Sequence, residues 1–189
     1  MKYEDLPVDA CFEIGIEQRN QASYGYLSKP LIDSLADLFA GKRVVEAYAG
    51  RGILASILAE RGVNIHATSL RMGHDCSESM GHLCDVENCS VLDAVIRYGH
   101  EMDYLLVCWP LADETLWRTL AYLPEHVRIV FIGEITDYLS KPIFLGGCAS
   151  DRFFDSVVDC EDLTATLRYP TPRHDKIKVY RAIPGLSLV

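Results

Sequence analysis

Apolar residues recur at a helical period ahead of the first strand-like run of the chain. Leu31, Leu35 and Leu38 are spaced by four and three residues, with Ser28 available as a cap before them and Gly41 as a stop after them. This spacing places apolar side chains on one face of a helix. The pattern therefore predicts one helix between residues 28 and 41.

Strand-like and helix-like segments alternate from there to residue 133. RVVEAY (43–48) predicts a buried strand, GILASILAERG a helix, and NIHATS a second strand. Further strands are predicted at VENCS, DYLLVCW and VRIVFIG, with helices at LDAVIRYGHE and at 114–122, where Asp113 is a cap and Pro124 a stop. This alternation predicts an α/β fold: a doubly wound, mostly parallel sheet with helices on both faces.

The last third of the chain has a different pattern. GGCASDRFFDSV predicts a glycine loop and a short helix capped by Ser150. LTATLRY and IKVYRAI both alternate like strands, and the proline-rich turn PTPRHDK joins them. We therefore expect a C-terminal antiparallel hairpin added to the parallel sheet.

Composition limits the class of protein. With 189 residues, 49% of them hydrophobic, the chain is long enough for one domain with a substantial core, so we expect a single domain over residues 1–189. No apolar run approaches the roughly 20 residues of a membrane span, and the N-terminal residues lack the layout of a secretory signal. Seven cysteines, an odd number, favour reduced thiols. A cytoplasmic protein without membrane contact is expected.

The charge of the chain argues against a nucleic-acid partner. The formal net charge is −9, and the basic residues are scattered rather than gathered in a run. A polyanion is normally held by several Lys or Arg side chains on one face. We therefore expect no binding to DNA or RNA.

The stretch VVEAYAGRG, residues 44–52, carries the main functional signal. Gly50 and Gly52 form a Gly-x-Gly turn between a predicted strand and a predicted helix, and Glu46 precedes them. The letters also satisfy G-x-G-x-x-A, and Arg71 after the second strand suits a ribose 2′-phosphate, so an NADP site is one alternative. A carboxylate beside the turn would repel a pyrophosphate but favours a cationic ligand such as S-adenosylmethionine.

VVEAYAGRG resembles the first motif of the class I S-adenosylmethionine-dependent methyltransferases, a Rossmann-like family. In that family an acid is followed by x-x-x-G-x-G. The resemblance implies that Glu46, Ala47, Gly50 and Gly52 surround the methionine half of S-adenosyl-L-methionine. Tyr48 stands where many members have another glycine.

Two further segments extend the resemblance. VLDAVIRYG resembles the segment after strand three whose acid holds the adenine amino group, which implies Asp93 with Ala94 beside it. The family's second strand usually ends in an acid that grips both ribose hydroxyls, whereas here Thr68 and Ser69 offer single hydroxyls. Ser69 is thus the candidate ribose contact.

The end of the predicted fourth strand, DYLLVCWP, faces the transferred methyl group in the family. Cys108 is a candidate nucleophile or cofactor contact, although packing is the commoner role of a cysteine at a strand end. Trp109 has a flat face that suits a pocket wall. Glu134 follows the fifth strand at the same edge of the sheet, where it is a candidate base or amine-orienting group.

A zinc site is a further alternative. His74, Cys76, His82, Cys84 and Cys89 are all competent ligands. Their spacing matches no common zinc module, so we expect no metal.

These observations predict an S-adenosylmethionine-dependent methyltransferase that acts on a small molecule or a peptide-borne acceptor such as a protein side chain. The alternatives are a non-catalytic S-adenosylmethionine-binding module or regulator and an NADP-dependent oxidoreductase. The sequence leaves the acceptor and the oligomeric state open.

Overall fold

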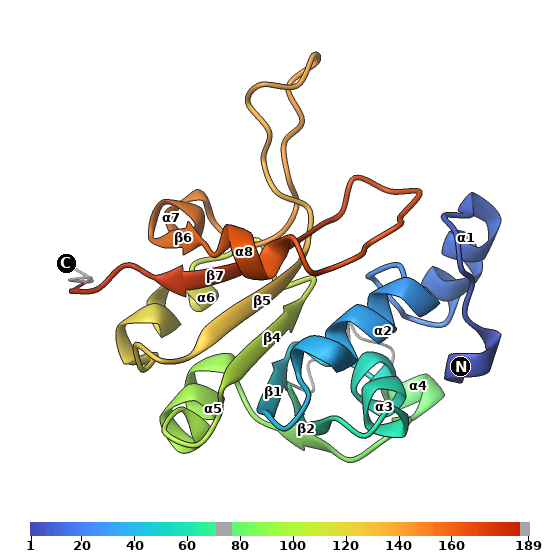
Figure 1. Ribbon diagram of the computed structural model, residues 1–189, viewed down its shortest axis with the longest axis horizontal. Helices are drawn as coiled ribbons and strands as arrows, with labels where there is room; N and C mark the ends of the chain where they lie inside the picture. The colour runs from blue at the N-terminus through green and yellow to red at the C-terminus, as the bar shows by residue number, and fades with distance from the viewer. Residues whose placement is uncertain (71–76, 186–189) are drawn as a thin grey trace.

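The computed structural model describes residues 1–70 and 77–185 of the chain. A seven-stranded sheet with the order β3-β2-β1-β4-β5-β7-β6 runs through these residues (Figure 1). The strands are β1 (Arg43–Ala47), β2 (Asn64–Ser69), β3 (Val86–Asn88), β4 (Tyr104–Cys108), β5 (Arg128–Gly133), β6 (Val157–Asp159) and β7 (Lys176–Ala182).

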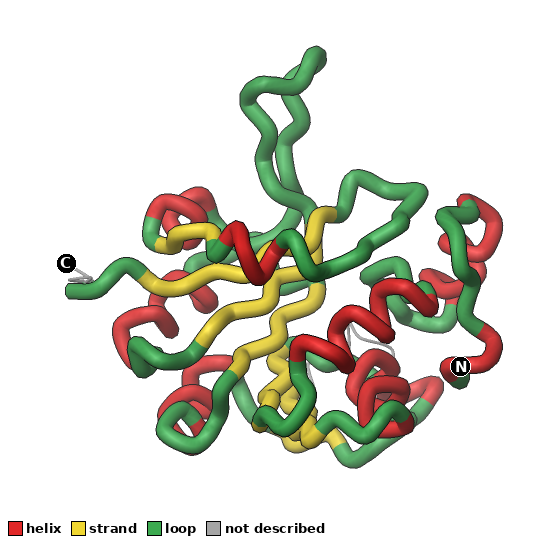
Figure 2. Tube along the Cα trace, viewed as in Figure 1, coloured by secondary structure: helices red, strands yellow, loops and turns green. Residues whose placement is uncertain are grey.

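Helices cover both faces of the sheet, as Figure 2 shows. The α-helices are α1 (Phe12–Asn20), α2 (Lys29–Leu38), α3 (Ile53–Glu60), α4 (Ser77–Met80), α5 (Val91–Tyr98), α6 (Thr115–Thr119), α7 (Asp151–Asp155) and α8 (Glu161–Thr164). Two 3-10 helices are η1 (Tyr3–Asp5) and η2 (Leu120–Tyr122). None of the helices in the described ranges is long and apolar enough to cross a membrane.

The alternation of side chains along the strands divides the core into two layers. Val45 of β1 and Leu105 of β4 pack on the face covered by α5, α6 and α7. Val44 and Leu106, their neighbours in sequence, pack on the face covered by α2 and α3. Because successive strand residues point to opposite faces, a continuous apolar run serves both layers.

The strand directions create a switch point at the middle of the sheet. β1 is paired in parallel with β2 on one side and with β4 on the other, and β4 is parallel to β5. The chain therefore winds away from β1 in both directions. In open α/β sheets, ligands bind at the carboxyl ends of the strands at such a point.

The C-terminal antiparallel strands are confirmed, but one of the two predicted segments is wrong. β7 pairs with β5 and with β6, whereas LTATLRY (163–169) forms no strand. Its first residues end α8, where the Thr164 hydroxyl donates to Asp159 and accepts from the Val179 amide. Leu163 and Leu167, four residues apart, pack on the α2–α3 layer. The seven residues of LTATLRY fit both the alternation of a strand and the four-residue spacing of a helix, so the sequence pattern alone was ambiguous.

Most of the other predicted elements are confirmed within two residues, but α5 ends at Tyr98, three residues before the predicted end of LDAVIRYGHE. Ser28 and Ser150 stand at the predicted N-cap positions, and neither side chain makes the expected cap hydrogen bond. α2 lies within residues 28–41, and Gly41 has the left-handed φ of 70° that a helix stop favours. The helix predicted at 114–122 is α6 continued by η2, and Asp113 accepts a hydrogen bond from the Thr115 amide.

Two segments outside the alternating strands and helices flank the carboxyl edge of the sheet. The cap is residues 9–27, which include α1. The arm is residues 134–147, a long excursion between β5 and α7 that projects from the body in Figures 1 and 2.

Candidate functional site

A cavity of about 520 Å³ lies at the carboxyl ends of the central strands. Its lining comes from the cap, from the segments after β1, β2, β3 and β4, and from the arm. The lining residues are Tyr24, Tyr48, Gly50, Ser69, Leu70, Cys89, Ser90, Val91, Cys108, Trp109, Pro110, Leu111, Ala112, Asp113, Thr115 and Gly147. This is the position that the switch point predicts for a ligand.

The turn after β1 contains three left-handed residues, two of which line the cavity. Tyr48, Gly50 and Gly52 have φ values of 61°, 54° and 73°. This conformation is natural for glycine but uncommon for tyrosine. Strained residues of this kind cluster at functional sites, and the Tyr48 ring lines the cavity.

The two glycines of the turn have different surroundings. Gly50 lines the cavity. At Gly52, by contrast, a Cβ atom would lie 2.5 Å from the Cys84 sulfur and 2.8 Å from a Val86 methyl group. Gly52 therefore allows α3 to start close to the β3 side of the fold, and it does not line the cavity.

The carboxyl group of Glu46 is buried beneath this turn rather than exposed in the cavity. Its side chain is 1% exposed, and Oε2 has no hydrogen-bond partner among the described residues. Burial raises the pKa of Glu46 to about 8, opposed only by a hydrogen bond from the Ala55 backbone. At neutral pH the carboxyl group is mostly uncharged. The attraction to a cationic ligand that the sequence suggested therefore requires the bound cation to lower the pKa of Glu46.

Arg51 fastens the turn to two other segments. Its guanidinium donates to the carbonyl oxygens of Gln21 at 2.8 Å, Gly81 at 2.8 Å and Met80 at 3.1 Å. The Leu83 amide donates in return to the Arg51 carbonyl. Arg51 is buried, and backbone carbonyls satisfy its guanidinium. The cap and the segment after α4 are thereby held against the glycine turn.

Trp109 forms the wall of the cavity after β4. It has a left-handed φ of 55°, and its amide donates to the Ile132 carbonyl at 2.7 Å. The ring lies 6.4 Å from the ring of Tyr24, and the Arg19 guanidinium lies 5.7 Å from its centroid. Both Tyr24 and Arg19 belong to the cap, so this wall is shared between the sheet and the cap.

Cys108 lines the cavity beside Trp109, and Gly25 lies close enough that a Cβ there would be 2.9 Å from its sulfur. Burial raises the pKa of the Cys108 thiol well above its usual value, and Glu46 and Asp175 raise it further. The thiol is therefore protonated at neutral pH. A thiolate nucleophile needs the opposite environment.

Glu134 lies at the root of the arm. Its Oε2 accepts a hydrogen bond from the Gly147 amide at 3.2 Å, and Gly147 lines the cavity. Glu134 thus borders the cavity through Gly147 without being part of the lining.

The segment after β3 gives a mixed result for the predicted adenine contacts. Ser90 caps α5: its hydroxyl accepts from the Asp93 amide at 3.1 Å and donates to the Asp93 carboxylate at 2.6 Å. Ala94 is fully buried in the core, as is Ala47 on β1. Ser90 lines the cavity, so Asp93 orients a lining residue.

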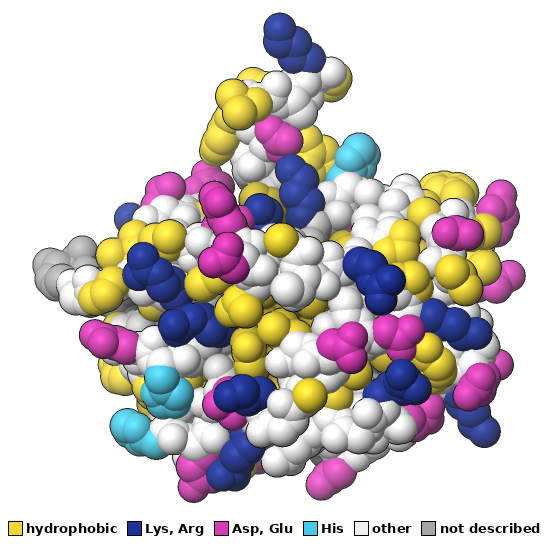
Figure 3. Space-filling model, in the orientation of Figure 1, with side chains coloured by type: hydrophobic (Ala, Val, Ile, Leu, Met, Phe, Trp, Pro, Cys, Tyr) yellow, Lys and Arg dark blue, Asp and Glu magenta, His cyan; other side chains and the backbone are white. Residues whose placement is uncertain are grey.

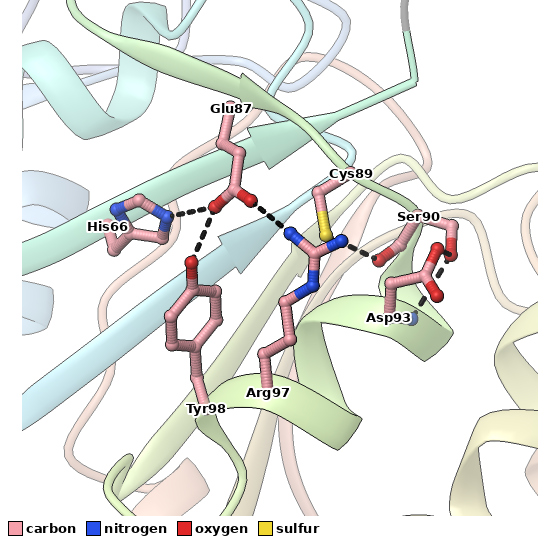
Figure 4. Close-up of polar contacts among 7 residues, drawn as sticks. All are labelled: His66, Glu87, Cys89, Ser90, Asp93, Arg97 and Tyr98. Atoms are coloured by element: carbon pink, nitrogen blue, oxygen red, sulfur yellow. Dashed lines mark hydrogen bonds and ion pairs between the residues drawn. The ribbon is translucent and has the colours of Figure 1, made fainter.

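A polar cluster behind this segment holds α5 to β2 and β3, as Figure 4 shows. Glu87 of β3 accepts hydrogen bonds from His66 at 2.7 Å, Arg97 at 2.6 Å and Tyr98 at 2.7 Å. The bonds from Tyr98 and His66 lower the pKa of Glu87. Cys89, two residues after Glu87, lines the cavity, so this cluster lies next to the lining.

The alternatives named from the sequence fall partly outside the described residues. Arg71, His74 and Cys76 lie outside them. Among residues 1–70 and 77–185, no group of three His, Cys, Asp or Glu side chains is arranged to hold a metal ion. The Cys84 thiol instead donates to the Gly52 carbonyl at 3.4 Å.

Five of the candidates predicted from the sequence line the cavity: Tyr48, Gly50, Ser69, Cys108 and Trp109. It missed the residues that continue the same strand ends, which are Leu70, Cys89, Ser90, Val91, Pro110, Leu111, Ala112, Asp113 and Thr115. The rule that ligands lie at the carboxyl ends of strands was enough to find these. Tyr24 and Gly147 carried no such signal, because the cap and the arm come from outside the alternating part of the chain.

The sheet order, the turn after β1 and the cavity together define the class I methyltransferase fold. The CcbJ methyltransferase from Streptomyces caelestis is similar to this chain with a TM-score of 0.51 and 14% identity, over 82% of this chain and 94% of that one. A mutant of MtNAS in complex with S-adenosylmethionine gives a TM-score of 0.53 and 13% identity, over 91% of this chain and 73% of that one. MtNAS in complex with MTA and tNA gives a TM-score of 0.50 and 16% identity, over 82% of this chain and 59% of that one.

At these identities the likeness is one of fold, and it confirms the fold predicted from the first motif. No protein-family model and no curated protein matches the sequence.

Proposed function

We propose that this chain is a single methyltransferase domain that transfers a methyl group from S-adenosyl-L-methionine to a small molecule or a peptide-borne acceptor. The observation that carries the proposal is the cavity at the switch point, bounded by the glycine turn after β1 and by Trp109 after β4. Solved structures with the same fold hold S-adenosylmethionine or MTA, as their descriptions state. This agrees with the resemblance of VVEAYAGRG to the family's first motif.

The cavity fits such a ligand in its chemistry. Backbone at Gly50 and the ring of Tyr48 suit the methionine half, and the hydroxyls of Ser69 and Ser90 suit the ribose. The Glu46 carboxyl below the turn has an unsatisfied oxygen and a pKa of about 8. A sulfonium or ammonium group nearby favours the ionised carboxylate, so binding of the cation should release a proton.

Roles for the remaining candidates follow from their positions. Glu46, Ala47 and Gly52 shape the turn from below, and Asp93 and Ala94 hold the start of α5. Trp109, with Tyr24, forms the wall on the acceptor side. Glu134 orients the chain at Gly147, where an incoming amine or hydroxyl meets the cavity.

The chemistry asks little of a base. Methyl transfer is an in-line displacement at a carbon that its sulfonium already activates, so positioning of donor and acceptor supplies much of the rate. This agrees with the raised pKa of Cys108, which leaves no thiolate nucleophile at neutral pH. Cys108 is then a cavity wall rather than an attacking group.

A direct test compares S-adenosylmethionine, S-adenosylhomocysteine and NADP by calorimetry and thermal shift. A ligand that binds only the folded chain stabilises it by about 2.7 kcal/mol at a hundredfold excess over its dissociation constant. We expect stabilisation by the first two ligands. Stabilisation by NADP alone would refute the proposal and favour the oxidoreductase alternative.

A non-catalytic binding module is the second candidate, and one observation favours it. β2 ends in Ser69, which makes fewer and weaker hydrogen bonds than the carboxylate usual at this place. The two candidates separate when cell extract is added as a source of acceptors. Turnover to S-adenosylhomocysteine that is lost on heating the protein supports the enzyme, and binding without turnover supports the module.

A further inference from the structure

The arm is an ordered projection. Asp137 and Phe144 exchange two backbone hydrogen bonds, of 2.8 and 3.2 Å, across it. Ser140 is enclosed by bonds to Asp137, Pro142 and Phe144. At the root, the Gly146 amide donates to Thr136. The polar groups of the arm are therefore largely satisfied within it.

Side contacts hold the arm against the body of the molecule. Lys176 of β7 pairs with Asp137 at 3.2 Å, and the Tyr138 hydroxyl donates to Asp151 of α7. The Phe144 ring lies 4.5 Å from the ring of His174. The direction in which the arm projects is thus fixed by the fold.

The arm carries exposed apolar side chains, which Figure 3 shows in yellow on the projection, below a basic side chain at its tip. Leu139 is 92% exposed and Leu145 72% exposed, and Tyr138 and Ile143 are exposed as well. Fully burying one such side chain is favourable by about 1.5–3 kcal/mol. An ordered element that leaves four of them in water is suited to contact with another molecule.

The cap carries a second apolar surface. Phe12 and Ile16, four residues apart on α1, lie on one face of the helix and are both exposed, as is Val8 just before the cap. Arg173 donates to the carbonyls of Gly15 and Tyr24, and Arg51 to that of Gln21. The cap is therefore held in place with its apolar helix face outward.

The arm and the cap border the same cavity, and their exposed apolar side chains lie outside its lining. Gly147 at the root of the arm and Tyr24 of the cap both line it. A small molecule needs only the cavity. A molecule that touches both the arm and the cap extends beyond it and places a protruding group between them.

Charge indicates which kind of molecule this is. The arm holds Glu134, Asp137 and Lys141, and Lys176 pairs with Asp137. The cap holds Asp9, Glu13, Glu17 and Arg19, Arg173 donates to its carbonyls, and Asp113 lies in the cavity lining. These six acids outnumber the four bases, and the whole chain has a charge of −9. Anionic surfaces are repelled by this distribution, and cationic ones are attracted.

We propose that the arm and the cap form a docking surface for a polypeptide partner that combines apolar and basic side chains and presents a residue to the cavity. The inference rests on the proposed function, because it selects the peptide-borne acceptor from the two classes left open. The exposed apolar side chains on the two segments that border the cavity, and complementary charge, are what support it.

The test uses three fluorescent synthetic peptides and the full chain. One peptide alternates Leu and Lys, the second Leu and Glu, and the third Ser and Lys. We expect fluorescence anisotropy to show binding of the Leu/Lys peptide alone. The double variants L139S/I143S and F12S/I16S should each weaken it about tenfold or more, as expected when apolar anchors are removed. Ile96 of α5, 56% exposed and away from the cavity, provides the control I96S, which should bind like wild type.

Equal affinity of wild type and both double variants would overturn the proposal, as would equal binding of the Leu/Glu peptide. Sedimentation of the wild type as a dimer that these variants dissociate would also overturn it, by showing that a second copy occupies the surface. Thermal shift by S-adenosylhomocysteine is measured on the same samples. If S-adenosylhomocysteine causes no thermal shift of the wild type, the proposed function is refuted. The anisotropy result reports on docking alone.

Discussion

Glu46 gives the sharpest quantitative prediction, because its carboxyl group is fully buried on a central strand. Its pKa is about 8 in the folded chain against an ordinary 4.5, so between these values the folded state holds a proton that the unfolded state has lost. Stability must then fall as the pH rises, by 1.36 kcal/mol for each pH unit. The loss is about 4 kcal/mol from pH 4.5 to pH 8 and about 3 kcal/mol from pH 4.5 to pH 7.

Glu46→Gln removes the titration while keeping an oxygen for the Ala55 amide. Urea unfolding of both proteins at intervals from pH 5 to pH 8 gives the difference in their free energies of unfolding. We expect this difference to move in favour of the variant by about 1.4 kcal/mol per pH unit. A cost of burying the amide that does not depend on pH changes the difference in free energy of unfolding equally at every pH. It leaves the slope of that difference against pH unchanged.

A flat difference would refute the reasoning, since it would mean that Glu46 has the same pKa in both states. The same pair of proteins tests the link to the ligand. In wild type, the affinity for S-adenosylmethionine should rise with pH up to about 8 relative to that for S-adenosylhomocysteine, which lacks the sulfonium charge. In Glu46→Gln that relative change should be absent.

Three further substitutions test the packing around the site. Gly52→Ala should destabilise the fold by roughly 2–5 kcal/mol because the added Cβ meets the Cys84 sulfur. The control Gly41→Ala has a similar φ but open space around it, so it should cost about 1–2 kcal/mol. Equal losses in urea unfolding would contradict the close approach at Gly52. Arg51→Met should cost about 3 kcal/mol or more by stranding three carbonyls, with the exposed Arg118→Met near zero as control. Glu87→Gln should destabilise the chain above pH 4.5, and the difference from wild type should shrink as the pH falls through the lowered pKa of Glu87; a difference independent of pH would argue against it.

The central sheet was predictable because its segments are short, apolar and separated by clear stops. RVVEAY and VRIVFIG are buried on both faces, so composition alone identified them as strands. LTATLRY was ambiguous, since seven residues fit two periods and only contacts with Asp159 and Val179 decide between them.

The site was predictable where it depends on local backbone and not where it depends on distant contacts. The turn at Gly50 and the strand end at Trp109 are encoded nearby. The role of Gly52 depends on Cys84, 32 residues away, and the burial of Glu46 depends on α3 above it. Tyr24 reaches the cavity because distant residues, among them Arg51 and Arg173, hold the cap in place.

The reversed strand β7 has a consequence for the order in which the molecule is built. β7 follows β6 in the chain yet lies between β5 and β6 in the sheet. During synthesis, β5 therefore remains an unpaired edge until Lys176–Ala182 has left the ribosome, and β6 has no strand to join before then. Open edges of this kind pair readily with other chains. Truncation before β7 should thus yield aggregation rather than a smaller folded protein.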